Sequence, residues 1–423
     1  MKNILLFVAA LSVMEAAGAE AQRVWRPFND SSPWNQKIPP DVQIDPQSQE
    51  LIDGVAKGVF NVNIAEWSIP LYYINADTVP KVHVINSRTG IYGRGFAEPN
   101  AIPILPCFVA SPPVGEFSDN HMSIIDTARK IEWGMWATRK NKDGVWTTGL
   151  GAVTDLGGTG VERPWFDQER DLDAHRARAG GFPLVAGLIR PEEIQAGRIG
   201  HALVFAYQRG RSEFFVPPAS TAQATFMEMD NKSGIPMGGR IQLDPVIDVD
   251  TLPLSPACKV IARALQEYGA FNGDYAGATV LYADNSPRAV ALWEGVLKPD
   301  DFQKVFTPAF IRKYFRVIKL GDLLPGQNLA GGEIGFVAFT FPGARNVSVD
   351  WLARRVTCIA DSSMDLAHVT PAFRTVRKNS RVSIDSKEQT SGTSVVDLRR
   401  PVTCRIEVPG VGVAEWTLIV HTH

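Results

Sequence analysis

Side chains able to do chemistry crowd into one short stretch, DNHMSIIDTARKIEWGMW at residues 119–136. Polar and apolar residues alternate along it, and a period of two predicts β-strands. We predict a hairpin with strands at residues 121–126 and 131–136, joined by a four-residue loop. The pleat then places one polar and aromatic set on a single face, namely His121, Ser123, Ile125, Glu132, Gly134 and Trp136. The opposite face is the apolar set Met122, Ile124, Ile131, Trp133 and Met135.

Glu132 on this face, together with carboxylates elsewhere in the chain, suggests acid–base chemistry on a sugar. In a glycoside hydrolase one carboxylic acid protonates the glycosidic oxygen, while a second carboxylate attacks or activates water. Glu132 is the predicted acid, and Asp274 or Asp155 is the predicted second group. His121 lies opposite Trp136 in this register, roughly 13 Å along the sheet from Glu132, so the two would line different sugar subsites.

Substrate binding needs flat apolar surface and hydrogen-bond donors. Trp136 is the predicted stacking platform for a sugar ring, because an indole offers both a large face and an N–H donor. Ser123 and Arg240 are further predicted substrate-binding residues.

A polysaccharide lyase is the alternative enzyme. Elimination needs a base at the uronate C5, a proton donor and a cation that neutralises the carboxylate. The candidates are His121 or His201 as base, Tyr268 or Tyr207 as donor, and Arg190 or Arg240 as cation. A third interpretation is a non-catalytic carbohydrate-binding or adhesion protein.

Strong catalytic signatures are absent from the sequence, which has no phosphate loop, no His-Glu-x-x-His helix and no Gly-x-Ser-x-Gly elbow. Each candidate residue therefore also has a structural interpretation. His201, which alternates with Leu203 and Phe205, could be a histidine of the core instead of a catalytic base. The sequence predicts no cofactor and no metal site.

Composition restricts the partners. Lys and Arg total 43 against 45 Asp and Glu, and a net charge of −2 argues against nucleic acid or an anionic membrane as partner. The apolar run at residues 4–14 and the triplet Ala19-Glu20-Ala21 predict a signal peptide over residues 1–21 and a mature chain from Gln22. We therefore expect a secreted or periplasmic protein, with a polysaccharide or oligosaccharide as its partner.

The elements that must position these residues are mostly short strands. We predict a mainly β fold, in which residues 22–325 form a β-sandwich or jelly-roll domain with a few helices. The best helix pattern is SPACKVIARALQEYG, capped by Ser255, opened by Pro256 and ended by Gly269. A charged loop at residues 162–181 is a predicted cover or lid.

The C-terminal residues 333–423 predict an immunoglobulin-like β-sandwich of short alternating strands after a linker at residues 321–332. Cys358 and Cys404 lie in two of these strands, and we predict a disulfide between them.

Several motifs together carry a resemblance: SPWNQKIP, HMSIID with IEW, GLIRPEEIQAGRIGHALVF, IPMGGRIQLDP and ALQEYGAFNGD. In these the chain resembles a widespread group of exported bacterial proteins of unassigned function. The resemblance covers roughly residues 30–290. It implies export and one large module, and it implies no activity or catalytic residue.

Overall fold

The computed structural model describes residues 24–58, 60–87, 96, 101–111, 119–167, 177–222, 233–298, 300–327 and 333–422. The predicted signal peptide and the middle of the predicted lid, residues 168–176, lie outside them. Strands dominate and helices are few, so the predicted mainly β fold is confirmed. Among the described residues, no helix has the length and apolar character needed to cross a membrane.

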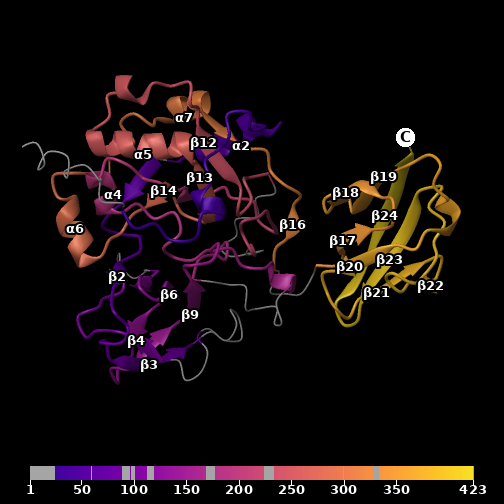
Figure 1. Cartoon of the computed structure of the whole chain (residues 1–423), viewed down its shortest axis with the longest axis horizontal. Coiled ribbons are helices and arrows are strands. Elements are labelled where there is room, and N and C mark those ends of the chain that lie inside the picture. The colour runs from indigo at the N-terminus through magenta and orange to yellow at the C-terminus, as the bar shows by residue number, and fades with distance from the viewer. Residues whose placement is uncertain are drawn as a thin grey trace, which may run out of the picture.

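The centre of the larger part is a mixed six-stranded sheet (Figure 1). In spatial order its strands are β1 (Phe60–Asn63), β14 (Thr279–Tyr282), β10 (Leu203–Ala206), β13 (Ala270–Asp274), β12 (Arg240–Leu243) and β15 (Phe315–Val317). The pairs β1–β14 and β10–β13 are parallel, and the other pairs are antiparallel.

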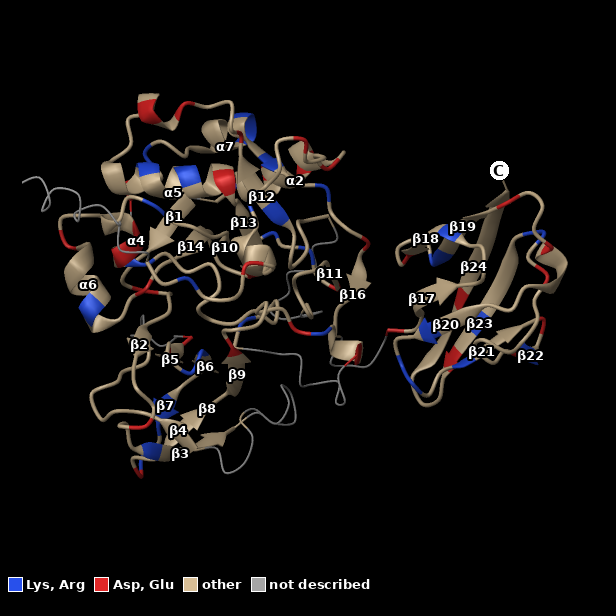
Figure 2. Ribbon diagram, viewed as in Figure 1, with Lys and Arg blue, Asp and Glu red and all other residues tan. Residues whose placement is uncertain are grey.

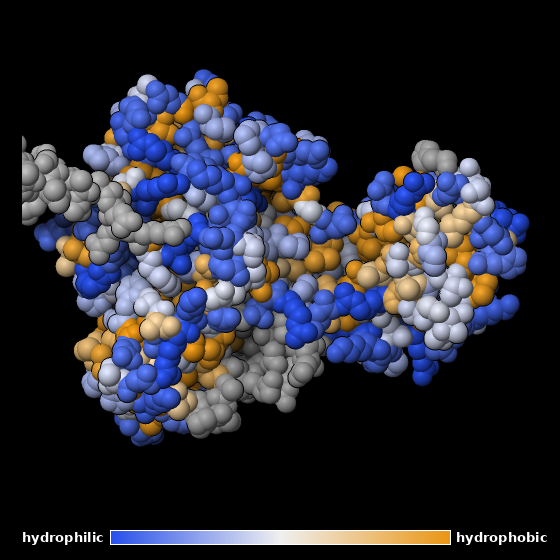
Figure 3. Space-filling model, viewed as in Figure 1, coloured by the Kyte–Doolittle hydropathy of each residue, from blue (hydrophilic) through white to orange (hydrophobic). Residues whose placement is uncertain are grey.

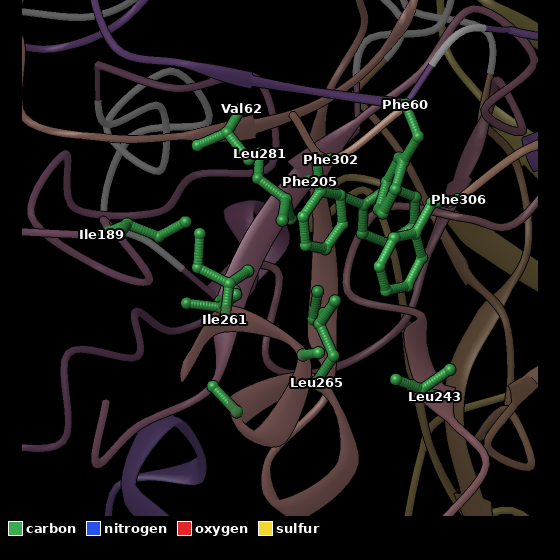
Figure 4. Close-up of a cluster of buried hydrophobic side chains, with 14 of the residues drawn as sticks. Phe60, Val62, Ile189, Phe205, Leu243, Ile261, Leu265, Leu281, Phe302 and Phe306 are labelled. Atoms are coloured by element: carbon green, nitrogen blue, oxygen red, sulfur yellow. The ribbon is translucent and has the colours of Figure 1, made fainter. Parts of the chain in front are cut away.

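Helices cover one face of this sheet. They are α2 (Ser48–Val55), α5 (Pro256–Glu267) and α7 (Pro308–Tyr314), with the short helices α4 (Pro191–Gln195) and α6 (Pro287–Trp293) beside them. Ser255 caps α5 through its hydroxyl, which accepts from the Cys258 N–H, and Gly269 follows at a φ of 67°, as the sequence predicted. Figure 4 shows the core between helices and sheet, where Phe302 and Phe306 stack beside Phe60 with ring centroids 3.9 Å apart.

Two four-stranded sheets pack face to face below the six-stranded sheet and form a β-sandwich. The first consists of β2 (Leu71–Tyr73), β5 (Met122–Asp126), β6 (Ile131–Trp136) and β9 (Leu150–Asp155). The second consists of β4 (Ala101–Pro103), β3 (Lys81–Asn86), β8 (Trp146–Thr148) and β7 (Arg139–Lys140). The first sheet therefore has a core on each side, because residues 182–188 pack between it and the six-stranded sheet.

Short elements complete this part of the chain. They are the 3-10 turns η1 (Pro33–Asn35), η2 (Trp165–Asp167) and η3 (Val249–Thr251), and the ribbon of β11 (Phe214–Phe215) with β16 (Leu324–Pro325).

The C-terminal module is a β-sandwich, as predicted. Its larger sheet has the order β18 (Arg345–Asp350), β19 (Arg355–Ala360), β24 (Gly412–Thr422), β23 (Val402–Val408), β21 (Arg381–Ile384) and β22 (Lys387–Glu388). The smaller pairs β17 (Phe336–Thr340) with β20 (Ala372–Thr375), and η4 (Leu366–His368) lies between β19 and β20 in the chain. Trp416 and Phe336 lie in the core between the sheets, with ring centroids 5.7 Å apart.

The predicted disulfide is wrong, since all four cysteines are free thiols. Strand β24 lies between β19 and β23, so two strand spacings, about 10 Å, separate the strands that carry Cys358 and Cys404. Along β24 their partners, Val420 and Trp416, are also in different positions. A disulfide requires Cα atoms within about 7 Å, and this sheet keeps them apart.

Candidate functional site

The hairpin at residues 122–136 has the predicted register. Met122 pairs with Met135 and Ile125 with Glu132, so the two faces hold the predicted residues. The apolar face packs in the β-sandwich core. The polar face is covered as well, because Ser123 and Glu132 are each 0% exposed. The alternation in the sequence predicted correctly which residues share each face of the hairpin. It did not indicate that residues 182–188 would cover the polar face.

One carboxylate oxygen of Glu132 accepts hydrogen bonds from two neighbouring groups. Its Oε1 accepts a 2.6 Å hydrogen bond from the Ser123 hydroxyl and a 2.8 Å bond from the Val185 backbone N–H. This carboxylate ties the hairpin to the covering segment. A fully buried carboxylate in such contacts is better suited to positioning than to proton transfer with a substrate.

His121 lies just ahead of β5 and is buried, with Nε2 3.2 Å from the Ala177 carbonyl oxygen. Burial lowers the pKa of His121, the charge of Asp119 opposes this shift, and Arg178 adds to it. The imidazole is therefore neutral around neutral pH.

Arg178 is the buried cation of this region, with only 3% of its surface exposed. Its Nη2 donates to the Leu184 carbonyl at 3.1 Å, and its guanidinium lies 4.6 Å from the ring centroid of Tyr282. Nε and Nη1 have no hydrogen-bond partner among the described residues. Burial lowers the pKa of Arg178, while Tyr282, Asp274 and Glu132 raise it.

Asp274, at the end of β13, is half-buried and interacts with the charge of the same cation. Burial of the carboxyl group and the nearby charge of Asp119 raise the pKa of Asp274 to about 7, against the opposing effect of Arg178. Asp119 and Asp274 are therefore interacting carboxyl groups, and Asp274 keeps its proton up to near neutral pH.

The edge of this cluster carries aromatic surface. The Trp136 indole Nε1 lies 3.3 Å from Asp119 Oδ1 and donates to it, and its ring is half-buried. Tyr282, on β14, stays protonated because burial raises its pKa well above the usual value, and the charge of Asp274 adds to this. We call Asp119, His121, Trp136, Arg178, Asp274 and Tyr282 the carboxylate–arginine cluster.

Glycines bring the backbones behind this cluster into contact. The Gly180 N–H donates to the Gly273 carbonyl at 2.9 Å, and a Cβ on Gly180 would lie 3.2 Å from that oxygen. A Cβ on Gly273 would lie 2.7 Å from the Phe182 ring. Because glycine has no side chain, the two backbones can approach this closely, and Arg178, two residues before Gly180, interacts with Asp274, which follows Gly273.

A second buried charged group contains two of the predicted residues. Arg190 donates from Nη2 and Nε to the two oxygens of Glu193, at 2.6 and 3.1 Å. His201 Nε2 lies 2.9 Å from Glu193 Oε1, and its Nδ1 is 2.9 Å from the Ala202 carbonyl. Although Glu193 is buried, Arg190 and His201 hold its pKa down to about 2. These contacts connect α4 to the start of β10 and hold His201 beside Glu193.

The remaining predicted residues lie apart from the cluster. Arg240 donates to the backbone carbonyls of Tyr268 and Gln36, at 2.7 and 2.8 Å, and burial lowers its pKa to about 10. The Tyr207 hydroxyl is buried and accepts a 2.6 Å bond from the Ile235 N–H. Asp155 is exposed at the end of β9 and accepts from the Gly157 N–H at 2.7 Å, which is a turn contact.

Sequence reasoning missed Asp119, Arg178 and Tyr282. Asp119 stands two residues before His121, and Arg178 belongs to the charged loop predicted to cover something. Tyr282 had no distinguishing signal, because it lies in an ordinary apolar strand. In the part of the chain that the structure describes, no group of His, Cys, Asp or Glu is arranged to hold a metal ion.

No family model matches the chain, and no curated protein matches it either. Among solved structures, a candidate glycoside hydrolase from Bacteroides thetaiotaomicron matches with a TM-score of 0.18 and 16% identity, over 22% of this chain and 26% of that one. A candidate secreted protein from Bacteroides fragilis matches with a TM-score of 0.16 and 11% identity, over 22% of this chain and 92% of that one. At these TM-scores neither indicates a fold or an activity for this chain.

Proposed function

We propose that this protein is a secreted glycoside hydrolase acting on a polysaccharide, with the carboxylate–arginine cluster as its active site. The observation that carries the proposal is the pair of interacting carboxyl groups, Asp119 and Asp274, beside a buried guanidinium. Export is supported by the apolar run and small-residue triplet that precede Gln22.

Asp274 is the proposed general acid. A carboxylic acid with a pKa of about 7 is protonated below neutral pH, so it can donate its proton to the glycosidic oxygen as the C–O bond breaks. Asp119 is the proposed second carboxylate. It either attacks the anomeric carbon, giving a glycosyl-enzyme that water then hydrolyses, or takes a proton from the water that attacks directly.

Trp136 and Arg178 are the proposed binding groups. The half-buried indole ring, fixed by its hydrogen bond to Asp119, can stack on a sugar face. The Nε and Nη1 donors of Arg178 can bind sugar hydroxyls.

Local charge favours a neutral sugar over a uronate. Among the described residues, Asp119 and Glu132 place two carboxylates near the guanidinium of Arg178, while Asp274 carries its proton in the role of acid. A uronate would bring another negative charge into this surplus, which costs free energy in a partly desolvated site. This argues against the lyase, whose substrate must be a uronate.

The test is a panel of neutral and uronate polysaccharides incubated with the mature chain, with reducing ends and ultraviolet absorbance recorded together. We expect new reducing ends from a neutral polysaccharide without any absorbance of a conjugated double bond. Asp274→Asn should lose this activity, whereas Asp155→Asn, which removes the same charge at the exposed end of β9, should keep it. Absorbance from a uronate polymer would instead establish the lyase, and binding without product would establish a carbohydrate-binding protein.

A further inference from the structure

The C-terminal module contacts the larger part of the chain through the end of β20 and the residues after it. Val376 is only 3% exposed and packs in the core cluster that lies behind the carboxylate–arginine cluster, with Val337 and Trp351 at its margin. Figure 3 shows apolar surface along the waist between the two parts. The module is thus docked, although the linker residues 328–332 lie outside the described chain.

Two arginines of the module reach the turn η2. Arg374 forms an ion pair with Asp167, and its guanidinium lies 5.7 Å from the ring centroid of Phe166. Arg377 lies 5.1 Å from the ring centroid of Trp165 and bonds to Glu333 at 3.0 Å. All three residues of η2 are therefore in contact with charges from the module. Elsewhere, the basic (blue) and acidic (red) positions along the ribbon are interspersed over both parts (Figure 2).

From η2 a series of backbone hydrogen bonds leads to the cluster. The Trp165 N–H donates to the Ser220 carbonyl at 2.9 Å, and the Ser220 N–H donates to the Gly180 carbonyl at 3.1 Å. Gly180 in turn donates to Gly273, which directly precedes Asp274. Each bond joins segments far apart in the sequence, so a displacement of η2 moves the backbone next to Arg178 and Asp274.

We propose that Arg374 and Arg377 of the C-terminal module are positioning residues for the active site, acting through η2 and this series of backbone bonds. The expected effect on catalysis rests on the proposed function. The connection between the module and the cluster does not depend on that function. Release of η2 would loosen Gly180 against Gly273 and admit water around Asp274 and Arg178.

The first measurement is hydrogen exchange of the full chain, which needs no substrate. The double variant Arg374→Ala, Arg377→Ala should exchange about fivefold faster or more at residues 177–184 and 270–274, while α5 keeps its protection. Arg399→Ala is the matched control, since Arg399 belongs to the same module and pairs with the exposed Asp397. Asp167→Asn, which removes the ion pair from the other side, is the second variant if the double variant unfolds.

The second measurement is the pH dependence of hydrolysis. Among the described residues, Asp119, Arg178, Tyr275 and Tyr282 are the charged or titratable groups that interact with Asp274, and His121 interacts with Asp119 and Arg178. Solvation of Asp274 favours its charged form, so the alkaline limb of the profile should move to lower pH in the double variant and stay in place in Arg399→Ala. A variant that is less stable, but in which Asp274 is no more solvated, would keep the alkaline limb of its pH profile at the same pH.

The outcomes separate the two proposals. Unchanged exchange at residues 177–184 in both the double variant and Asp167→Asn would overturn the positioning role. Faster exchange in a protein that releases no sugar from any polysaccharide would support the positioning role and overturn the proposed hydrolase.

Discussion

Replacing Asp274 by asparagine should stabilise the protein above neutral pH and remove its activity at the same time. Because the pKa of Asp274 rises from 3.8 to about 7 on folding, the folded state binds this proton more tightly than the unfolded state. The contribution of Asp274 to stability is therefore full below pH 3.8 and is lost as the pH rises to about 7. Asparagine keeps the size of the side chain and has no such loss.

The magnitude follows from the same shift. A rise from 3.8 to about 7 corresponds to about 4 kcal/mol, at about 1.4 kcal/mol for each pKa unit, and this is an upper limit because Asp274 is only half-buried. Between about pH 5 and about pH 8 the free energy of unfolding of Asp274→Asn should gain about 1–3 kcal/mol relative to the natural chain.

Denaturant unfolding at both pH values, followed by tryptophan fluorescence, measures this gain. Asp155→Asn is the control, since it removes an exposed carboxylate and should show no comparable gain between the two pH values. The reasoning would be refuted if Asp274→Asn showed the same difference from the natural chain at both pH values, because Asp274 would then titrate as an ordinary surface carboxylate.

Three further expectations test single contacts. Glu132→Gln should lower the free energy of unfolding by about 1–3 kcal/mol, since the carboxylate accepts two buried hydrogen bonds; full stability with complete loss of turnover would instead return Glu132 to the role of acid. Trp136→Ala should weaken substrate binding by about 1–3 kcal/mol with little change in kcat, and equal affinity by calorimetry would exclude stacking. Peptide mapping under non-reducing conditions should find Cys358 and Cys404 as separate thiols, and a linked peptide would show that the order of β19, β24 and β23 is wrong.

Local patterns predicted local structure well. Alternation was enough for the register of the 122–136 hairpin, because one wrong step would have turned Met122 and Met135 away from their core. Ser255, Pro256 and Gly269 fixed the ends of α5, since capping is decided within one turn.

The candidate site is formed by contacts between segments that are distant in the sequence. These contacts could not be predicted from local sequence patterns. His121, Trp136 and Asp274 were predicted and lie in the cluster, but their neighbour Arg178 comes from a loop placed by backbone bonds to Ser220 and Gly273. The disulfide prediction failed for the same reason. Two strand-like runs with a cysteine each say nothing about the strand that separates them.

The contact between Gly180 and Gly273 limits how this site could diversify. A Cβ at Gly273 would collide with Phe182 and Val204, and one at Gly180 would press on the Gly273 carbonyl, so both positions beside the carboxylate–arginine cluster disfavour substitution. Under the proposed function, we expect changes in the sugar accepted to arise at Trp136, which lies partly exposed at the edge of the cluster. Libraries aimed at a new specificity should therefore vary that edge and leave the glycine pair untouched.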